Sequence, residues 1–158
     1  MAIGLFLKCS GCTGESENKE YTNWTHCSSF SWGVSQPSSM ERGGGGSAGL
    51  GTFADLVVTA MMDKAYPDIL EKCASGDHLG KVELAGAKMG GNQWEYMKIT
   101  LEDVLVTSVS VSGSDGAEVI VAFGFQGSKL TAEYSPQTAK GTKGATIPKK
   151  WDVKKNTK

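Results

Sequence analysis

One stretch of the chain decides the fold class, and it reads Gln93-Trp94-Glu95-Tyr96-Met97-Lys98-Ile99-Thr100-Leu101-Glu102-Asp103-Val104-Leu105-Val106-Thr107-Ser108-Val109-Ser110-Val111-Ser112. It is rich in β-branched and aromatic residues, contains no Gly or Pro, and alternates with a period of two, which indicates β-strand. The adjacent carboxylates Glu102 and Asp103 are disfavoured in strands. The stretch therefore predicts two consecutive strands that are joined at a bend.

Each of these two predicted strands has one strongly apolar face, because neighbouring side chains in a strand point to opposite sides. In the first strand the apolar face carries Met97, Ile99 and Leu101. In the second strand it carries Leu105, Thr107, Val109 and Val111. The opposite face of the second strand begins with Val104 and Val106 and continues with the small hydroxyl side chains of Ser108, Ser110 and Ser112. This pattern is typical of the wall of a β-sandwich or β-barrel.

Shorter alternating segments surround this stretch and predict further strands at 3–7, 27–36, 53–60, 81–88, 119–125, 130–134 and 151–153. Only Asp63–Ser75 has the features of a helix. Pro67 suits a first helical turn, Gly76 suits a left-handed end, and the apolar stripe comprises Ile69, Leu70 and Cys73. We therefore predict an all-β fold, a barrel or a sandwich, with one flanking helix and a single domain over residues 1–158.

Alternation in the segment 27–36 separates bulky from small side chains. Phe30, Trp32 and Val34 share one face, and the opposite face carries Ser29, Ser31 and Ser35 with Gly33. A strand with aromatic residues on its core side and small hydroxyls outside is suited to line a water-filled channel. By patterning alone, an ordinary solvent-exposed face is an equally good interpretation.

The segment 37–51 has no periodicity and includes four consecutive glycines. Long segments of this kind are uncommon in compact domains, and they are usually functional or disordered. Because strands are predicted on both sides of it, we predict an arm that contacts other protomers rather than a linker. The arm residues expected to make these contacts are Ser38, Met40, Gly43, Gly44, Gly45, Gly46 and Leu50.

Composition limits the classes of partner. The chain has 158 residues and a formal net charge of -1, so no overall field attracts nucleic acid, and no membrane insertion is expected. The apolar opening Ala2–Leu7 is too short to span a membrane and lacks the preceding basic residues of a signal peptide. The sequence therefore predicts folding in the cytoplasm, with any export by a route that reads no signal peptide.

Candidate chemistry centres on Cys9-x-x-Cys12 with His26 and Cys27. A redox pair is expected at a helix N-terminus, whereas this pair follows a strand. The spacing of the four residues is also unusual for zinc. The favoured interpretation is therefore that these thiols are structural or incidental. A metal or redox site is the less favoured alternative. No nucleophile, base and orienting group occur together, so the sequence predicts no enzyme, no cofactor and no metal.

The central stretch from Glu95 to Ser110 closely resembles the haemolysin-coregulated protein (Hcp) family, the tube component of bacterial type VI secretion. Further matches stand in the order that the family shows. They are 30–36, 43–49, Asp63-Lys64-Ala65 with Pro67, 73–76, 121–125 and 133–137. Departures from the family are Cys9, Cys12 and His26, and Tyr66 in place of a serine before the helix proline.

The resemblance implies a barrel that assembles into a hexameric ring with a wide channel. It also implies that rings stack into a tube propelled by a contractile sheath, with spike and sheath components as partners. The protein would carry effector proteins in its lumen and would itself be secreted. On this interpretation, Ser29, Ser31 and Ser35 are lumen-facing candidates. The alternative is a small thiol- or metal-dependent effector that uses Cys9, Cys12, His26 and Cys27.

Overall fold

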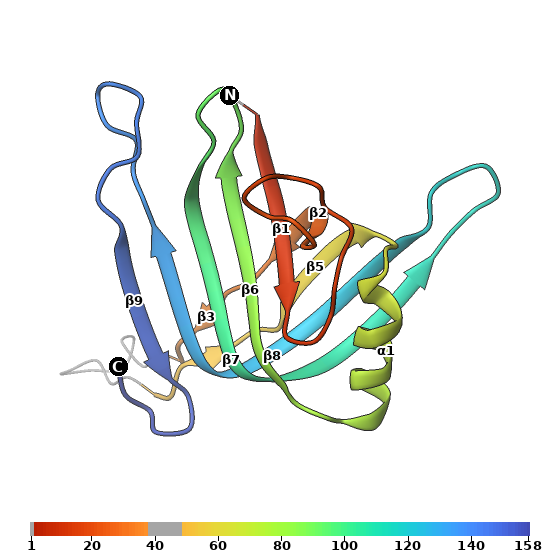
Figure 1. The fold of residues 1–158 in the computed structure, drawn as a ribbon. Coiled ribbons are helices and arrows are strands. Elements are labelled where there is room, and N and C mark those ends of the chain that lie inside the picture. The colour runs from red at the N-terminus through yellow and green to blue at the C-terminus, as the bar shows by residue number, and fades with distance from the viewer. Residues whose placement is uncertain (1, 38–48) are drawn as a thin grey trace.

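The computed structural model describes residues 2–37 and 49–158 (Figure 1). Within these residues, strands form where the sequence alternates between apolar and polar side chains. Ten elements follow one another along the chain: β1 Ile3–Cys9, β2 Thr25–Ser31, β3 Val34–Ser35, β4 Thr52–Phe53, β5 Leu56–Met61, α1 Ala65–Ser75, β6 Leu79–Lys88, β7 Trp94–Ser112, β8 Ile120–Tyr134 and β9 Ile147–Asp152. The predicted class, mainly β with one helix, is confirmed.

Six strands close into a barrel in the order β5-β2-β1-β6-β7-β8, because β5 also pairs with β8. All pairings in this sheet are antiparallel. The strand β8 is long enough to pair with β5 over 120–125 and with β9 over 129–134. The strand β9 is therefore an extra strand outside the barrel, and Figure 1 shows it at the left, far from α1.

The barrel interior is filled by aliphatic and aromatic side chains from every wall. The largest fully buried side chains are Phe123, Phe125, Leu7, Leu56, Leu79, Leu84 and Leu101 from the strands and Ile69 from α1. Alternation in the sequence predicts one apolar face with Ile99 and Leu101 and another with Val121, Phe123 and Phe125, and all five are buried. Burial of such apolar surface supplies the main stabilisation of the barrel.

Two predicted breaks in the strands are wrong. The 93–112 stretch forms one strand, β7, and 120–134 forms one strand, β8, where two were expected in each case. The bend at Asp103 is present inside β7, where Asp103 has a left-handed φ of 51°. The register with β8 continues unshifted across it, with Glu102 opposite Lys129 and Val104 opposite Gly127. The strand therefore bends at this residue without ending.

The bend also changes which face of β7 enters the core. Val104 and Val106 are buried, whereas Leu105 from the predicted apolar face is exposed. Val111, from the same predicted face, is exposed near the end of β7. Val34 in β3 and Leu70 on α1 are also exposed, although both were expected in apolar stripes. In β7, alternation indicates the buried face correctly only up to the bend.

The helix α1 agrees with its sequence signals. Pro67 lies in the first turn, and Gly76 ends the helix in a left-handed conformation while its N–H bonds to the Lys72 carbonyl at 3.0 Å. Asp63 accepts a hydrogen bond from the Ala65 N–H at 3.0 Å and so partly replaces the missing side-chain cap. The helix packs on β7 with Ile69 fully buried. Within the described residues, no helix is long and apolar enough to cross a membrane.

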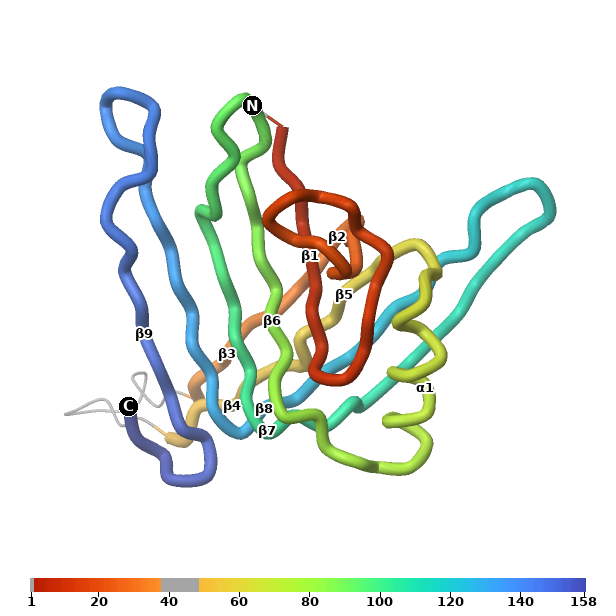
Figure 2. The backbone as a smooth tube through the Cα atoms, in the orientation of Figure 1, coloured from red at the N-terminus to blue at the C-terminus, as the bar shows by residue number. Residues whose placement is uncertain are grey.

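The segment between β1 and β2 is more ordered than a loop of its polarity suggests. Gly14, Ser16 and Asn23 exchange backbone hydrogen bonds across it, and it covers the outer face of β1 and β6, as the smooth trace of Figure 2 shows. Beneath it a second small core forms around Phe6, whose ring stacks on Tyr21 with centroids 4.5 Å apart.

Candidate functional site

The serine face predicted from alternation lies on the outside of the barrel. Ser29 and Ser31 in β2 and Ser35 in β3 are all exposed, whereas Phe30 packs against the core. A bulge between Cys27 and Ser29 adds Ser28 to this exposed row. The three serines therefore form an accessible hydroxyl surface, and its use as the lining of a lumen stays a prediction.

The predicted arm leaves the barrel from a small hairpin. Val34 pairs with Phe53 and Ser35 with Thr52, and the Gly49 N–H bonds to the Pro37 carbonyl at 3.4 Å. Leu50 is exposed at the returning end of this stem. The other arm residues, Ser38, Met40 and Gly43 to Gly46, lie outside the described residues, so their predicted contacts stay a prediction.

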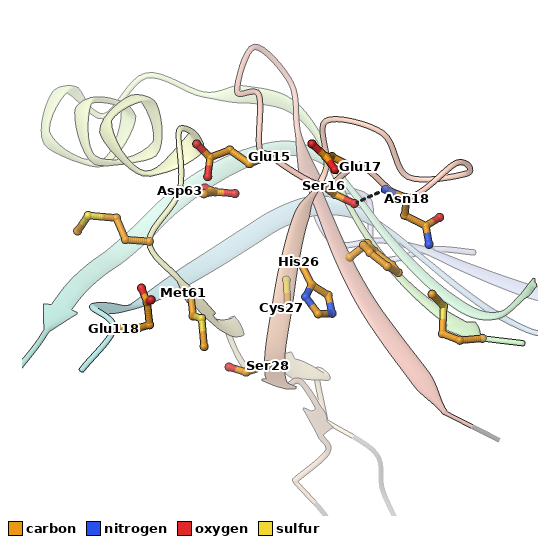
Figure 3. Close-up of a pocket in the computed structure, with 13 residues that line it drawn as sticks. Glu15, Ser16, Glu17, Asn18, His26, Cys27, Ser28, Met61, Asp63 and Glu118 are labelled. Atoms are coloured by element: carbon orange, nitrogen blue, oxygen red, sulfur yellow. Dashed lines mark hydrogen bonds between the residues drawn. The ribbon is translucent and has the colours of Figure 1, made fainter. Parts of the chain in front are cut away.

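A cavity of about 780 Å³ opens between β2, the segment before it, and the start of α1 (Figure 3). Four carboxylates line it: Glu15, Glu17, Asp63 and Glu118. Phe6 and three methionines supply its apolar part, and no lysine or arginine is among its described lining residues. This cavity, which we call the acidic cavity, is chemically suited to hold cationic side chains with aliphatic stems.

The opposite side of the barrel is basic. The strand β9 carries Lys149 and Lys150, both exposed, and the following tail carries Lys154, Lys155 and Lys158. Because β9 is the last strand of the sheet, one of its edges faces away from the barrel. We call this surface the basic edge. Charged residues and Pro148 on such an edge discourage indiscriminate strand pairing.

Neither surface was predicted from the sequence. The four carboxylates of the acidic cavity come from three segments separated by more than forty residues. Only the closure of the barrel brings these segments together, so no local pattern in the sequence predicts the cluster of carboxylates. The lysines of the basic edge are close together in the sequence, but a run of lysines near a chain end is more often a solvated tail than a binding surface.

Within residues 2–37 and 49–158, no group of three or more His, Cys, Asp or Glu side chains is arranged to hold a metal ion. Burial raises the pKa of Cys12 to about 11 and that of Cys27 to about 12. Burial also raises the pKa of Cys9, with further contributions from the nearby Cys12 and Cys27. Such thiols are poor nucleophiles and poor metal ligands at neutral pH.

His78 pairs with a carboxylate at the bend of β7. Its Nδ1 lies 2.8 Å from Asp103 Oδ1. Asp103 Oδ2 also accepts hydrogen bonds from Lys154 Nζ at 2.9 Å and Ser128 Oγ at 3.2 Å. The hydrogen bonds from His78, Lys154 and Ser128 hold the pKa of the Asp103 carboxyl well below its usual range. This cluster fastens the C-terminal tail to the bend of β7.

We predict that Asp103→Asn loosens this tail. Asparagine also tolerates a left-handed φ, so the backbone of the bend is retained while the charge is lost. Hydrogen exchange of the peptide 150–158 is expected to accelerate roughly two- to fivefold, because exposed ion pairs are weak. Exchange measured by mass spectrometry at neutral pH checks this, with Asp77→Asn as the control.

The Asp103 cluster also makes the protection of the C-terminal tail depend on pH, and the direction of this dependence follows from the lowered pKa of Asp103. A carboxyl with a lowered folded pKa stabilises the folded state above its unfolded pKa, about 3.9, and this contribution is lost as the pH falls through the folded value. In the wild type, tail protection should therefore decline only below about pH 4. If the tail of the Asp103→Asn variant is as well protected as that of the wild type at pH 7, this role of Asp103 is contradicted.

Comparison with known proteins indicates the family of this chain. The family profile described as "Type VI secretion system effector, Hcp" matches residues 6–134. The chain is 38% identical over 161 residues to Protein hcp1 of Pseudomonas aeruginosa, covering 99% of this chain and 98% of the relative.

Solved structures agree with the sequence relatives. A structure described as a type six secretion system protein aligns with a TM-score of 0.93 at 26% identity, over 99% of both chains. The crystal structure of Hcp1 from Salmonella typhimurium aligns with a TM-score of 0.78 at 29% identity, again over 99% of both chains.

The barrel with its extra strand and small hairpin is thus the fold of a type VI secretion tube protein. The chain belongs to the Hcp family, and it is a structural tube subunit of the type VI secretion system. Ring assembly and secretion are properties of this family. The alternative of a thiol- or metal-dependent effector is not favoured, since the family relationship spans nearly the whole chain.

Proposed function

We propose that six copies of this chain close into a ring with a wide central channel, and that such rings stack into the tube that the sheath propels. The observation that supports this most is the pair of unlike surfaces on opposite sides of one protomer, the acidic cavity and the basic edge. A ring requires a head-to-tail interface, in which one surface of a protomer meets a different surface of the next.

The charges of the two surfaces favour this arrangement. The acidic cavity holds four carboxylates, and the basic edge holds five lysines within the last ten residues. Opposite charges on the two sides guide association and disfavour contacts between two identical sides. The net charge of -1 leaves little overall repulsion between copies.

The charge pairing gives a testable prediction. Lys149→Glu with Lys150→Glu should move most of the protein from rings to monomers at about 0.15 M salt, because like charges then face each other. The variant Lys19→Glu with Lys140→Glu changes the net charge equally at exposed positions elsewhere, and it should form rings normally. Light scattering on a sizing column measures both.

Reversing the charge of the acidic cavity as well provides the decisive control for this interface. A second variant, Glu15→Lys with Glu118→Lys, should also be monomeric alone. Mixed in equal amounts, the two variants should form rings. The edge made acidic in the first variant can then contact the cavity made basic in the second, and the unchanged basic edge of the second can contact the unchanged acidic cavity of the first. If the mixture stays monomeric while both variants remain folded by circular dichroism, this pair of surfaces is not the protomer interface.

The lumen of the proposed ring is lined by the exposed serines Ser29, Ser31 and Ser35, and it carries effector proteins. Small hydroxyls keep such a channel wet and offer many weak hydrogen bonds to unrelated cargo. The arm over 37–51 would contact neighbouring protomers or stacked rings. The protein has no active site in this proposal, folds in the bacterial cytoplasm and leaves through the type VI machinery without a signal peptide.

The position of the lumen is tested by labelling. In a Cys73→Ser background the remaining native thiols are buried, so Ser31→Cys should be the reactive position for a maleimide-linked gold particle. Electron microscopy should then show gold at the ring centre. Asn92→Cys, in the exposed turn before β7, is the matched control and should place gold away from the centre. Gold on the outer rim for Ser31→Cys would contradict the lumen assignment.

A further inference from the structure

The end of β1 holds two thiols in a tight turn. Cys9 is the last residue of β1, and Cys12 forms an antiparallel bridge with it, with the Cys12 N–H bonded to the Cys9 carbonyl at 3.1 Å. Gly11 supplies the left-handed φ of 77° that closes the turn.

This geometry fits a disulfide. Bridged residues in an antiparallel pair have Cα atoms about 4.5–5.5 Å apart, within the range of about 4.4–6.8 Å that disulfides need. Side chains of directly opposite residues point to the same face. Cys9 and Cys12 both belong to the main apolar cluster of the protein, as does Cys27.

The strand register excludes Cys27 as a partner of Cys9. Cys27 pairs with Leu5, four residues before Cys9, which corresponds to about 13 Å along the strand. That separation exceeds the limit of about 7 Å for a disulfide. Cys73 lies on α1, a half-buried position outside this turn.

We propose that Cys9 and Cys12 are a modification site, which closes into an intramolecular disulfide when the protein meets a low-molecular-weight disulfide oxidant. The reaction is a two-step exchange. The thiolate of one cysteine attacks the oxidant and releases one small thiol. The second cysteine then attacks the mixed disulfide and releases the other small thiol. The two thiol protons end on the two released thiols, and the oxidant takes up the two electrons.

Burial makes this exchange slow. Because burial raises the pKa of both thiols, few are ionised at neutral pH, and the four cysteines stay reduced in a reducing cytoplasm. Secretion moves the protein to an oxidising environment, in which the disulfide can form and persist. There it would fix the start of the 10–24 segment against the end of β1, beside Asp68 and Lys72 of α1.

Mass spectrometry tests the proposal directly. The intact protein is equilibrated overnight at pH 8 with glutathione at graded ratios of disulfide to thiol, denatured, and alkylated. Trypsin cleaves after Lys8 and Lys19, so Cys9 and Cys12 share one peptide while Cys27 lies in another. The 9–19 peptide should be two hydrogens lighter and unalkylated under oxidising ratios, while Cys27 stays alkylated.

Two variants make the result decisive. Cys27→Ser should leave the 9–19 disulfide unchanged, and Cys12→Ser should abolish it while the protein remains folded by circular dichroism. Oxidised wild type should also melt roughly 4 to 8 °C above reduced wild type at equal protein concentration, and this shift should vanish in Cys12→Ser. A 9–19 peptide that carries two alkyl groups or bound glutathione at every ratio would overturn the proposal, as would an unchanged melting temperature.

Discussion

Phe123→Ala is expected to lower the free energy of unfolding by about 3–5 kcal/mol, which is the typical cost of removing a buried aromatic ring. Phe123 is fully buried, and it lies on β8 opposite Val58 of β5 and Val109 of β7, where the barrel closes. Its ring centroid is 6.2 Å from that of Phe125. The closed barrel offers little room for the surroundings to collapse into the space that the ring leaves.

Urea unfolding at a protein concentration at which rings are dissociated measures this effect. Tyr134→Ala removes an aromatic ring from the same strand, but Tyr134 is 54% exposed, so its cost should be much smaller. If the two substitutions cost the same, or if Phe123→Ala costs less than about 1 kcal/mol, the seam between β5 and β8 is not the core of the protomer.

Gly14→Ala is the second substitution with a large expected effect. A Cβ atom at Gly14 would lie 2.5 Å from the Trp24 carbonyl oxygen and 2.7 Å from the Thr25 nitrogen. Both are backbone atoms, so no change of rotamer relieves the clash. We expect a loss of about 1–3 kcal/mol, typical of overpacking, together with opening of the 10–24 segment.

Opening of this segment has its own signature. Phe6, Tyr21 and Trp24 form an aromatic stack beneath it, and Tyr21 Oη donates to Glu95 Oε2 at 2.9 Å. Burial and this hydrogen bond raise the pKa of Tyr21 above its usual value. In the variant, Trp24 fluorescence should shift to the red and tyrosinate should form at lower pH. Gly90→Ala is the matched control, because that position faces open space.

How far the sequence alone predicts this fold depends on the regularity of the strands. Ile99, Leu101, Phe123 and Phe125 were placed in the core because alternation runs unbroken through them. Leu105 was misplaced because the left-handed Asp103 bends β7 and the buried face of the strand changes there. The carboxylates at the bend were recognised as a break in the alternation, but the change of face that follows was not.

The functional surfaces were less predictable than the core. The exposure of Ser29, Ser31 and Ser35 followed from alternation, since their neighbours are bulky. The acidic cavity depends on contacts between segments far apart in the chain, for which the sequence holds no periodic signal. The family relationship, by contrast, was readable from the sequence because many short motifs stand in one order over most of the chain.

The central claim, that this protein acts as a ring-forming tube subunit, is tested most directly by its molar mass in solution. Light scattering on a sizing column should give about six times the 16.7 kDa mass of the chain, and negative-stain images of the same peak should show rings with an open centre. A folded monomer at high concentration, with no rings in the images, would contradict the account.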